Sequence, residues 1–365
     1  MRKIDVIVGA RPNFMKAAAL FVVAPDYPGL ALRVIHTGQH YDVNMSHLFL
    51  QELGLPEPHR HLQVGSGSHA YQTATIMMRY EECVEEDRPG CCVVVGDVNS
   101  TVACALVASK LGIPVAHIEA GLRSFDRTMP EEINRVLTDS ISDLMFVTES
   151  SGLENLKREG RPESGIHLVG NTMIDTLLRL LPKAEELAPW DRFAVRPDDY
   201  VYITLHRPSN VDEKTIAGEI CEQIISIASR WPVVFLVHPR TRRRLDKYGL
   251  DRKLSEQPNL HLSEPLGYMD SLSLMRRAKL VITDSGGIQE ESTILGIPCL
   301  TLRENTERPI TVEQGTNTII GRNWALLKSC LQQIEEGSYL KRASDIPLWD
   351  GNSGERILQI LTDQL

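Results

Sequence analysis

The sequence lacks the features that mark membrane, nucleic-acid-binding and disulfide-rich proteins. No apolar stretch among its 365 residues is long enough to span a membrane. The formal net charge is -9, whereas a protein whose main partner is a nucleic-acid backbone needs a basic face. The seven cysteines are odd in number, form no C-x-x-C pair and lie mostly in apolar runs. These absences predict buried thiols, with neither a zinc site nor a disulfide framework.

Composition and length are those of an ordinary globular protein. Hydrophobic residues make up 42% of the chain and charged residues 24%, as in typical soluble domains. A chain of 365 residues is long enough for two domains. Its first residues run directly into an apolar segment without the pattern of a signal peptide. We therefore expect a cytoplasmic protein of two domains.

Apolar segments of strand length alternate with helical patterns along the chain, which predicts α/β domains with parallel, doubly wound sheets. In the first half the expected strands cover residues 4–8, 32–36, 92–96, 114–118, 144–147 and 166–169. In the second half they cover residues 200–205, 233–237, 260–262, 280–282 and 299–302. We expect one domain at residues 1–170 and a second at residues 171–351. A terminal helix at about residues 352–365 is expected to cross back to the first domain.

The clearest binding pattern is the stretch Thr283-Asp-Ser-Gly-Gly-Ile-Gln-Glu-Glu-Ser292, which follows an apolar strand and leads into helical spacing. Glycines at 286 and 287 let the backbone approach a ligand closely. Free N–H groups at the start of the following helix favour phosphate. Glu290 and Glu291 lie one turn further on, where a carboxylate could reach ribose hydroxyls. The pattern predicts the phosphate site of a nucleotide, although Ser-Gly-Gly alone fits an ordinary tight turn equally well.

Polar side chains follow the predicted strands in both halves, and ligands of open α/β sheets bind at the carboxyl ends of strands. The first half places there Arg11, His40, Asp97 and Glu119. The second half places there His206, Arg207, His238, Arg240, Glu264 and the turn 285–287. Two such edges predict a ligand in a cleft between the domains.

Three acids, Asp97, Glu119 and Glu131, are the candidate proton-transfer groups. Carboxylates gathered in a partly desolvated cleft repel one another, so some would have a raised pKa and hold or take protons near neutrality. Each acid alone also fits a structural role: a helix cap for Asp97, an ion pair with Arg123 for Glu119, and compensation of a helix dipole for Glu131. Basic residues at the same edge favour a catalytic role for these acids over a structural one.

The sequence gives little support to a metal or a bound dinucleotide. His206 and His238 have no partner at the close spacing that metal ligands on one helix show. Their arginine neighbours suit an anion better than a divalent cation. The first strand is followed by Gly9-Ala-Arg-Pro12 rather than by G-x-G-x-x-G. We expect neither a metal nor a cofactor.

Several short motifs follow one another along nearly the whole chain. They are Gly9-Ala-Arg-Pro12 with Lys16, Thr37-Gly-Gln-His40, Gly96-Asp97, His117-Ile-Glu-Ala-Gly-Leu-Arg123, Pro130-Glu-Glu-Ile-Asn-Arg135, His206-Arg207, Glu264-Pro-Leu266, Thr283-Asp-Ser-Gly-Gly-Ile-Gln-Glu-Glu291 and Thr306-Glu-Arg-Pro309. Each is weak alone, but the ordered set resembles the non-hydrolysing UDP-N-acetylglucosamine 2-epimerases. The resemblance implies a GT-B fold, with two Rossmann-like domains facing across a cleft, usually in a homodimer.

The resemblance also implies a reaction. UDP is eliminated across C1–C2 of the sugar to leave 2-acetamidoglucal, and it re-adds after C2 is protonated on the other face, without a metal or nicotinamide. Asp97, Glu119 and Glu131 would handle the C2 proton, with the base and the acid not assigned among them. The residues implied to bind the UDP-sugar are Arg11, Lys16, His206, Glu264, Ser285, Gly286, Gly287, Glu291 and Arg308. Of these, Arg11, Lys16 and His206 are also implied to assist catalysis.

Activation by a second UDP-GlcNAc, known in some bacterial members, is an open question for this chain. Gln39, Arg207 and His238 match residues of that second site. Asp42, however, stands where those members have Gln, and the loop 65–69 offers no matching Arg.

The identity of the sugar is also open. Ser209 replaces the Glu of the family motif His-Arg-x-Glu-Asn, and the run 38–46 also resembles the branch that epimerises UDP-2,3-diacetamido-2,3-dideoxy-glucuronate. That sugar is the close alternative to UDP-GlcNAc. A hydrolysing epimerase, a GT-B glycosyltransferase and a non-catalytic nucleotide-sugar sensor are the alternatives of other classes.

Overall fold

The computed structural model describes residues 1–38, 50–340 and 345–365. The chain divides into two compact units, one of Met1–Arg179 with Pro347–Leu365 and one of Leu180–Ile346. The first unit therefore extends past residue 170, the predicted boundary, and ends within a helix. Among the described residues, no helix is long and apolar enough to cross a membrane.

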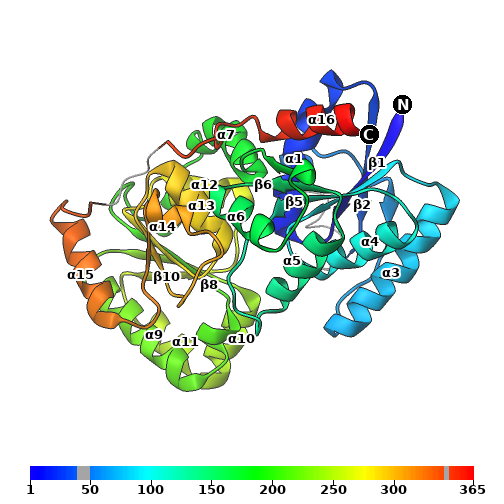
Figure 1. Ribbon diagram of the computed structural model, residues 1–365. Helices are drawn as coiled ribbons and strands as arrows, with labels where there is room; N and C mark the ends of the chain where they lie inside the picture. Colours follow the sequence, from blue (N-terminus) through cyan, green and yellow to red (C-terminus); the bar gives the residue numbers. More distant parts are fainter. Residues whose placement is uncertain (39–49, 341–344) are drawn as a thin grey trace. The chain divides into compact units, whose positions relative to one another are not determined.

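The first unit is built on a seven-stranded, all-parallel sheet in the order β3-β2-β1-β4-β5-β6-β7. Strands β1, β2, β5 and β6 of this sheet are labelled in Figure 1. Its strands are β1 (Arg2–Val8), β2 (Leu30–His36), β3 (Arg60–His61), β4 (Cys91–Val95), β5 (Val115–Ala120), β6 (Leu144–Val147) and β7 (Ile166–Leu168). Its helices are α1 (Arg11–Val23), α3 (His69–Glu86), α4 (Asn99–Lys110), α5 (Pro130–Ile141), α6 (Ser150–Arg158) and α16 (Ser353–Gln364), together with the first part of α7 (Thr172–Glu185), which continues into the second unit. Every residue of the central strands β4 and β5 is buried, as expected of a parallel sheet covered on both faces.

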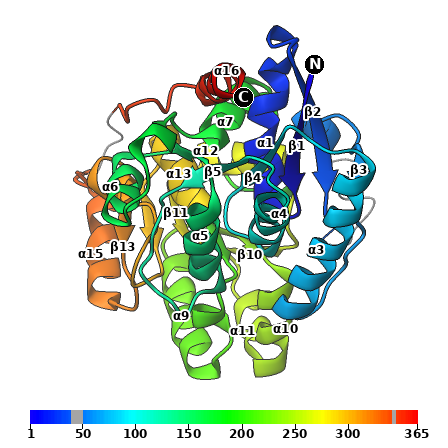
Figure 2. The ribbon, with the colours of Figure 1, turned by 45° about the vertical axis from the view of Figure 1, so that its right-hand side comes forward.

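Helices α3, α4 and α5 lie side by side against the first sheet (Figure 2). Helix α16 packs on α1 so closely that a Cβ added to Gly354 would lie 2.5 Å from the carbonyl oxygen of Ala19. The N–H of Gly354 donates to the Asp175 carboxylate over 2.8 Å. The end of the chain is thereby fixed to the first unit.

The second unit repeats the plan with a six-stranded parallel sheet in the order β10-β9-β8-β11-β12-β13. Its strands are β8 (Val201–Leu205), β9 (Val233–Val237), β10 (Leu260–Ser263), β11 (Leu280–Thr283), β12 (Cys299–Thr301) and β13 (Asn317–Ile319). Its helices are α8 (Pro208–Val211), α9 (Lys214–Ala228), α10 (Pro239–Tyr248), α11 (Leu250–Ser255), α12 (Tyr268–Arg276), α13 (Gly286–Leu295), α14 (Ile310–Glu313) and α15 (Trp324–Glu335). Short 3₁₀ turns lie at Ala24–Asp26 and Glu163–Gly165 in the first unit and at Pro189–Phe193 in the second.

The predicted fold class, two doubly wound α/β units of the GT-B type, is confirmed. In both sheets the central strands coincide with predicted ones. Strands β3 and β13, at the edges of the two sheets, were not predicted.

Candidate active site

Glu119 lies on an irregular part of β5. The strand was expected to end at Ile118, but it continues to Ala120 with a shift in its register against β6 between these two residues. Glu119 has a φ of 73°, a left-handed conformation that costs a non-glycine residue free energy. A bulge of this kind turns a side chain away from the regular alternation of the strand. It therefore gives the Glu119 carboxylate a direction that a regular strand would not.

The carboxylate of Glu119 is paired with the ammonium group of Lys16, and both side chains are almost completely buried. Lys16 lies on α1, whose start is fixed by Asn13: its amide donates to the Val95 carbonyl over 2.7 Å and its oxygen accepts from the N–H of Ala10 over 3.0 Å. Arg11 is the first residue of the same helix. The predicted cation Lys16 and the predicted acid Glu119 are thus in direct contact.

Asp97 follows β4, the neighbour of β5. Its carboxylate accepts from Arg135 over 2.5 Å, and its backbone carbonyl accepts from the Asn134 amide over 2.8 Å. Arg135 also pairs with Glu132 over 2.6 Å. A Cβ added to Gly96 would lie 3.3 Å from Oε2 of Glu119. The backbone just before Asp97 therefore lies close to the Glu119 carboxylate.

Glu131 is the second residue of α5 and is half-buried. Asn134 and Arg135, which hold Asp97, follow it on the same helix. The third candidate acid therefore lies on the helix that contacts the end of β4. Arg123, predicted as a structural partner for Glu119, instead binds Asp139 over 2.7 Å and Glu159. That alternative for Glu119 is wrong.

In the second unit, the buried carboxylate of Asp284 organises the residues after β8. It accepts from the backbone N–H groups of His206 and Arg207 over 3.0 and 2.9 Å and from the Asn210 amide over 2.9 Å. Nδ1 of His206 lies 3.0 Å from the same carboxylate. Burial alone would raise the pKa of Asp284, but the bonds from His206, Asn210 and Arg207 outweigh it and lower the pKa.

An ionised Asp284 requires that Nδ1 of His206 carries the proton. Nε2 of His206 is then the ring nitrogen left for a ligand, and 35% of this side chain is exposed. Nothing in the sequence pattern gave Asp284 a role, although it lies within the stretch 283–292. The role of Asp284 could have been inferred from its place, because it lies directly before the Ser-Gly-Gly turn at the end of a strand adjacent to β8.

Ser285, Gly286 and Gly287 form the start of α13, as predicted for a phosphate site. Ser285 is the residue before the helix, and its N–H donates to the Thr283 hydroxyl over 3.0 Å. The N–H groups of the first turn of a helix have no partner within the helix, and the helix dipole favours an anion there. A Cβ on Gly286 would lie 2.5 Å from the Arg308 guanidinium, so any larger residue would displace that side chain.

Arg308 and Glu291 lie within buried polar networks. Arg308 pairs with Glu290 over 2.8 Å and with Glu307 over 2.6 Å. Glu291 accepts a hydrogen bond of 2.9 Å from the Tyr268 hydroxyl. Burial raises the pKa of Glu291 to about 8, with the Tyr268 hydrogen bond lowering it and the charge of Glu290 raising it. Glu291 is therefore protonated near neutral pH and could both donate and accept a hydrogen bond.

The remaining candidate residues of the second unit are more exposed. Glu264 is exposed and lies 3.7 Å from Nε of Arg242. The rings of His206 and His238 are 5.7 Å apart between centroids. Nδ1 of His238 accepts from the N–H of Arg240 over 3.2 Å, and Arg207 is half-buried. Gln39, the third residue of the proposed second site, lies outside the described residues, as does Asp42.

Within the described ranges, no group of three His, Cys, Asp or Glu side chains could hold a metal ion. The chemistry at hand is that of carboxylates in the first unit and of a histidine with a helix N-terminus in the second. Such groups suit proton transfer and the stabilisation of an anionic leaving group.

Comparison with known proteins agrees with this chemistry. The model of the UDP-N-acetylglucosamine 2-epimerase family matches residues 25–362. A UDP-N-acetylglucosamine 2-epimerase of Methanocaldococcus jannaschii is 44% identical over 365 residues, 99% of each chain. A UDP-2,3-diacetamido-2,3-dideoxy-D-glucuronate 2-epimerase of Pseudomonas aeruginosa is 40% identical over 325 residues, 87% of this chain and 88% of its own. The crystal structure of the M. jannaschii enzyme in complex with UDP-GlcNAc and UDP superposes with a TM-score of 0.89, at 44% identity and 99% coverage of both chains. The chain belongs to the UDP-N-acetylglucosamine 2-epimerase family, a family of isomerases.

Proposed function

We propose that this protein is a non-hydrolysing epimerase that interconverts UDP-GlcNAc and UDP-ManNAc. The observation that supports this most directly is the buried carboxylate of Glu119, which the bulge of β5 aims at Lys16 beside the Gly96-Asp97 turn. Inversion at C2 requires a proton to leave one face and return to the other. Carboxylates on two adjacent strand ends and on the start of α5 supply more than one group for this transfer.

The first step is an elimination. A carboxylate of the first unit takes the C2 proton, and the electron pair of the C–H bond becomes the second bond between C1 and C2. The C1–O bond breaks, its electron pair stays on UDP, and 2-acetamidoglucal remains. In the second step a proton reaches C2 from the other face while a diphosphate oxygen of UDP re-adds to C1. Asp97, Glu119 and Glu131 are the proposed proton-transfer groups.

The second unit supplies the groups that hold UDP. Negative charge develops on the diphosphate as the C1–O bond breaks, and preorganised donors stabilise such charge. The proposed donors are the hydroxyl group of Ser285, the N–H groups of Gly286 and Gly287 at the start of α13, and Nε2 of His206. Glu291 would bind the ribose and Arg308 the sugar side. Arg11 and Lys16 are the proposed cations of the first unit, and Glu264 completes the proposed UDP contacts.

UDP-2,3-diacetamido-2,3-dideoxy-glucuronate is the second candidate substrate. It is favoured by the P. aeruginosa relative, whose 40% identity is close to the 44% of the M. jannaschii enzyme. The same carboxylates would act at C2, because both sugars have an acetamido group and a hydrogen there.

Proton NMR of the purified protein with UDP-GlcNAc in D2O tests the proposal. We expect UDP-ManNAc with deuterium at C2 and no free sugar. Free ManNAc with UDP would identify a hydrolysing enzyme instead. If UDP-GlcNAc is unchanged, the same assay with the diacetamido-glucuronate sugar decides between the two substrates, and no reaction with either would contradict the proposed epimerase activity.

We also propose that the protein works as a homodimer in the cytoplasm. All seven cysteines are free and buried, which suits a reducing compartment. Apolar side chains are exposed on α3 (Tyr71 and Met78) and on α5 (Ile133 and Leu137), the two helices on either side of α4, a pattern typical of an interface.

The oligomeric state can be measured by sedimentation velocity. We expect a dimer for the native chain and a monomer for Met78→Arg combined with Leu137→Arg. Leu340→Arg changes an exposed leucine outside these helices and should leave the dimer intact. A native monomer would contradict the proposal.

A further inference from the structure

His117 lies on β5, two residues before Glu119, and is completely buried. Its two ring nitrogens face two different acceptors. Nε2 is 2.8 Å from the carbonyl oxygen of Gly96, and Nδ1 is 2.6 Å from a carboxylate oxygen of Asp139. We propose that His117 is a doubly protonated imidazolium that fixes the ends of β4 and β5 and so positions Asp97 and Glu119. The protonation state stands on geometry alone, whereas the positioning role rests on the proposed function.

The partners of the ring determine its protonation. A backbone carbonyl accepts hydrogen bonds and donates none, so Nε2 must carry a proton. Asp139 accepts from the N–H of Gly121 over 3.0 Å and is paired with Arg123 over 2.7 Å. A carboxyl group surrounded by donors is ionised, and an ionised carboxylate also accepts only. Nδ1 must therefore carry a proton too.

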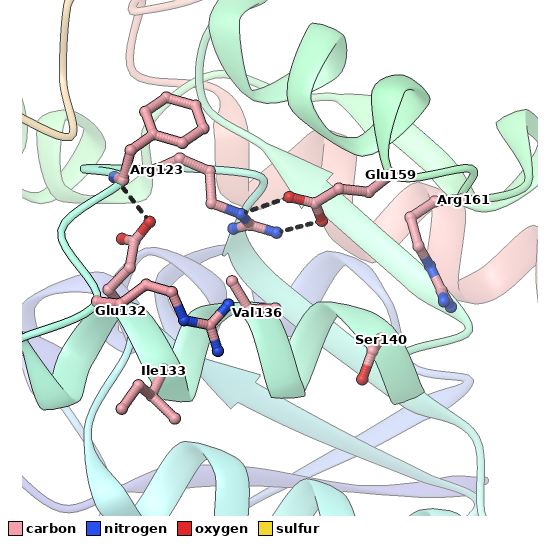
Figure 3. A pocket seen from close by; sticks show the side chains of 9 residues that line it. Arg123, Glu132, Ile133, Val136, Ser140, Glu159 and Arg161 are labelled. Atoms are coloured by element: carbon pink, nitrogen blue, oxygen red, sulfur yellow. Dashed lines mark hydrogen bonds and ion pairs between the residues drawn. The ribbon is translucent and has the colours of Figure 1, made fainter.

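The charges of this group balance, and three of its four members (His117, Arg123 and Asp139) are buried, whereas Glu159 is exposed. His117 and Arg123 are positive, and Asp139 and Glu159 are negative. Arg123 binds Glu159 through two hydrogen bonds of 2.8 and 2.7 Å (Figure 3). Burial alone would raise the pKa of Asp139, but His117 and Arg123 outweigh it and lower the pKa. Because a buried charge is stable only when it is paired and hydrogen-bonded, this network allows His117 to remain charged.

The hydrogen bonds of this network hold the backbone next to both candidate acids, Asp97 and Glu119. The Gly96 carbonyl directly precedes Asp97, and the Gly121 N–H lies two residues after Glu119. Gly96 and Gly121 have φ values of 67° and 82°. Glu119, with a φ of 73°, lies between His117 and Gly121, both of which are hydrogen-bonded to Asp139. Asp139 belongs to α5, the helix whose Arg135 holds the Asp97 carboxylate. The His117–Asp139 pair thus connects α5 to both strand ends.

His117 is a positioning residue, because its ring nitrogens are already bonded to protein acceptors and it is completely buried. Removing the pair should shift the acids without touching the residues that hold UDP in the second unit. A displacement of about 1 Å at a catalytic group can reduce a rate roughly 100-fold. The expected effect is therefore on kcat and not on the affinity for UDP.

The protonation state is tested first, on the unmodified protein. Nitrogen NMR with ¹⁵N-labelled histidine should show both ring nitrogens of His117 as protonated throughout the neutral pH range. The signal is assigned by its loss in His117→Asn, or in His117→Gln if the first variant does not fold. A ring nitrogen without a proton at neutral pH would overturn the proposal. This readout is independent of catalysis, so it stands even if the assay for epimerisation fails.

The positioning role is tested with His117→Asn, which cannot bond to both acceptors, and with Asp139→Asn. Each should lower kcat by roughly 100-fold while the Kd for UDP, measured by calorimetry, stays within about twofold. His167→Asn, which changes a half-buried histidine on the edge strand β7, serves as the control and should keep the native kcat. A folded His117→Asn protein with native kcat would overturn the role, as would an equal loss of UDP affinity.

Discussion

Lys16 and Glu119 form an ion pair from which solvent is almost completely excluded, since their side chains are 6% and 3% exposed. A buried charge that loses its partner destabilises a protein strongly, so the two groups depend on each other. The backbone at Glu119 is held in a left-handed conformation at a bulge, as is frequent at functional sites. Both features fix the carboxylate that we propose to exchange a proton with C2 of the sugar.

Glu119→Gln should lower the rate of epimerisation by about 10²- to 10⁴-fold, the usual contribution of a general acid or base. The amide keeps the size of the side chain but cannot accept a proton at the reaction pH. UDP should still bind, because the proposed partners of its diphosphate and ribose in the second unit (Ser285, Gly286, Gly287, His206 and Glu291) are unchanged. The rate is measured by deuterium incorporation at C2 and the affinity by calorimetry.

Glu154→Gln is the matched control for that variant. Glu154 is exposed on α6, and its replacement should leave both the rate and the affinity unchanged. A native rate of deuterium incorporation in Glu119→Gln would remove Glu119 from the proposed mechanism.

Asp284→Asn should reduce the affinity for UDP about tenfold or more. One carboxylate oxygen that accepts hydrogen bonds is replaced by an NH2 group, which would face other N–H donors and leave them unpaired. The lowered pKa of Asp284 also makes a prediction for stability. A carboxylate whose pKa is lower in the folded than in the unfolded state stabilises the fold above its unfolded pKa of about 3.9. This stabilisation is lost as the pH falls through the lower folded value.

Urea unfolding of the native chain and of Asp284→Asn across the acid range measures this effect. The difference in the free energy of unfolding between the two proteins should shrink as the pH drops below about 4. A difference that stays constant over the same range would show that Asp284 has the same proton affinity in both states.

The fold and the candidate residues at the strand ends could be predicted from the sequence because they depend on local patterns. Buried parallel strands read as continuous apolar runs, as in Cys91–Val95. Residues directly after such runs, including Asp97 and His206, must lie at the carboxyl edge of a sheet. Gly286 within Ser-Gly-Gly likewise marks a helix start that a ligand can approach.

The hydrogen-bond partners of these residues could not be predicted in the same way. Asp284 binds His206 from 78 positions further along the chain, and His117 binds Asp139 across 22 positions. Such pairs depend on strand order and on side-chain direction, which no local pattern contains. Edge strands β3 and β13 were missed because they are short and mostly polar, Arg60–His61 and Asn317–Ile319, so neither shows as an apolar run.

Glu291→Gln should remove a pH dependence of stability between acid and mildly alkaline conditions. The pKa of Glu291 is raised from 4.5 to about 8 by burial, so over this range the folded protein holds a proton that the unfolded chain has lost. The native protein should therefore lose stability as the pH rises from about 4.5 to about 8, by up to about 1.4 kcal/mol per pH unit. The glutamine cannot ionise and should lack this contribution.

Thermal or urea unfolding at several pH values compares the two proteins. Glu222→Gln changes an exposed glutamate of α9 and should keep the native pH dependence. Identical pH profiles for Glu291→Gln and the native chain would show that Glu291 ionises at its ordinary pKa.

Gly286→Ala should weaken UDP binding by at least tenfold and lower the free energy of unfolding by about 1–3 kcal/mol, the usual cost of overpacking. The new Cβ would lie 2.5 Å from Nη1 of Arg308 and 2.6 Å from Oε1 of Glu307, so it must displace the buried pair that these two side chains form.

Gly218→Ala is the control: Gly218 lies within α9 with no atom within 4 Å of an added Cβ. That change should leave UDP binding unchanged and stabilise the helix by roughly 0.5–1 kcal/mol. Calorimetric titration with UDP and urea unfolding separate the two effects. Native affinity for UDP in Gly286→Ala would contradict a close approach of the diphosphate to the start of α13. That approach depends on the position of Arg308 and on the space that Gly286 leaves by having no side chain.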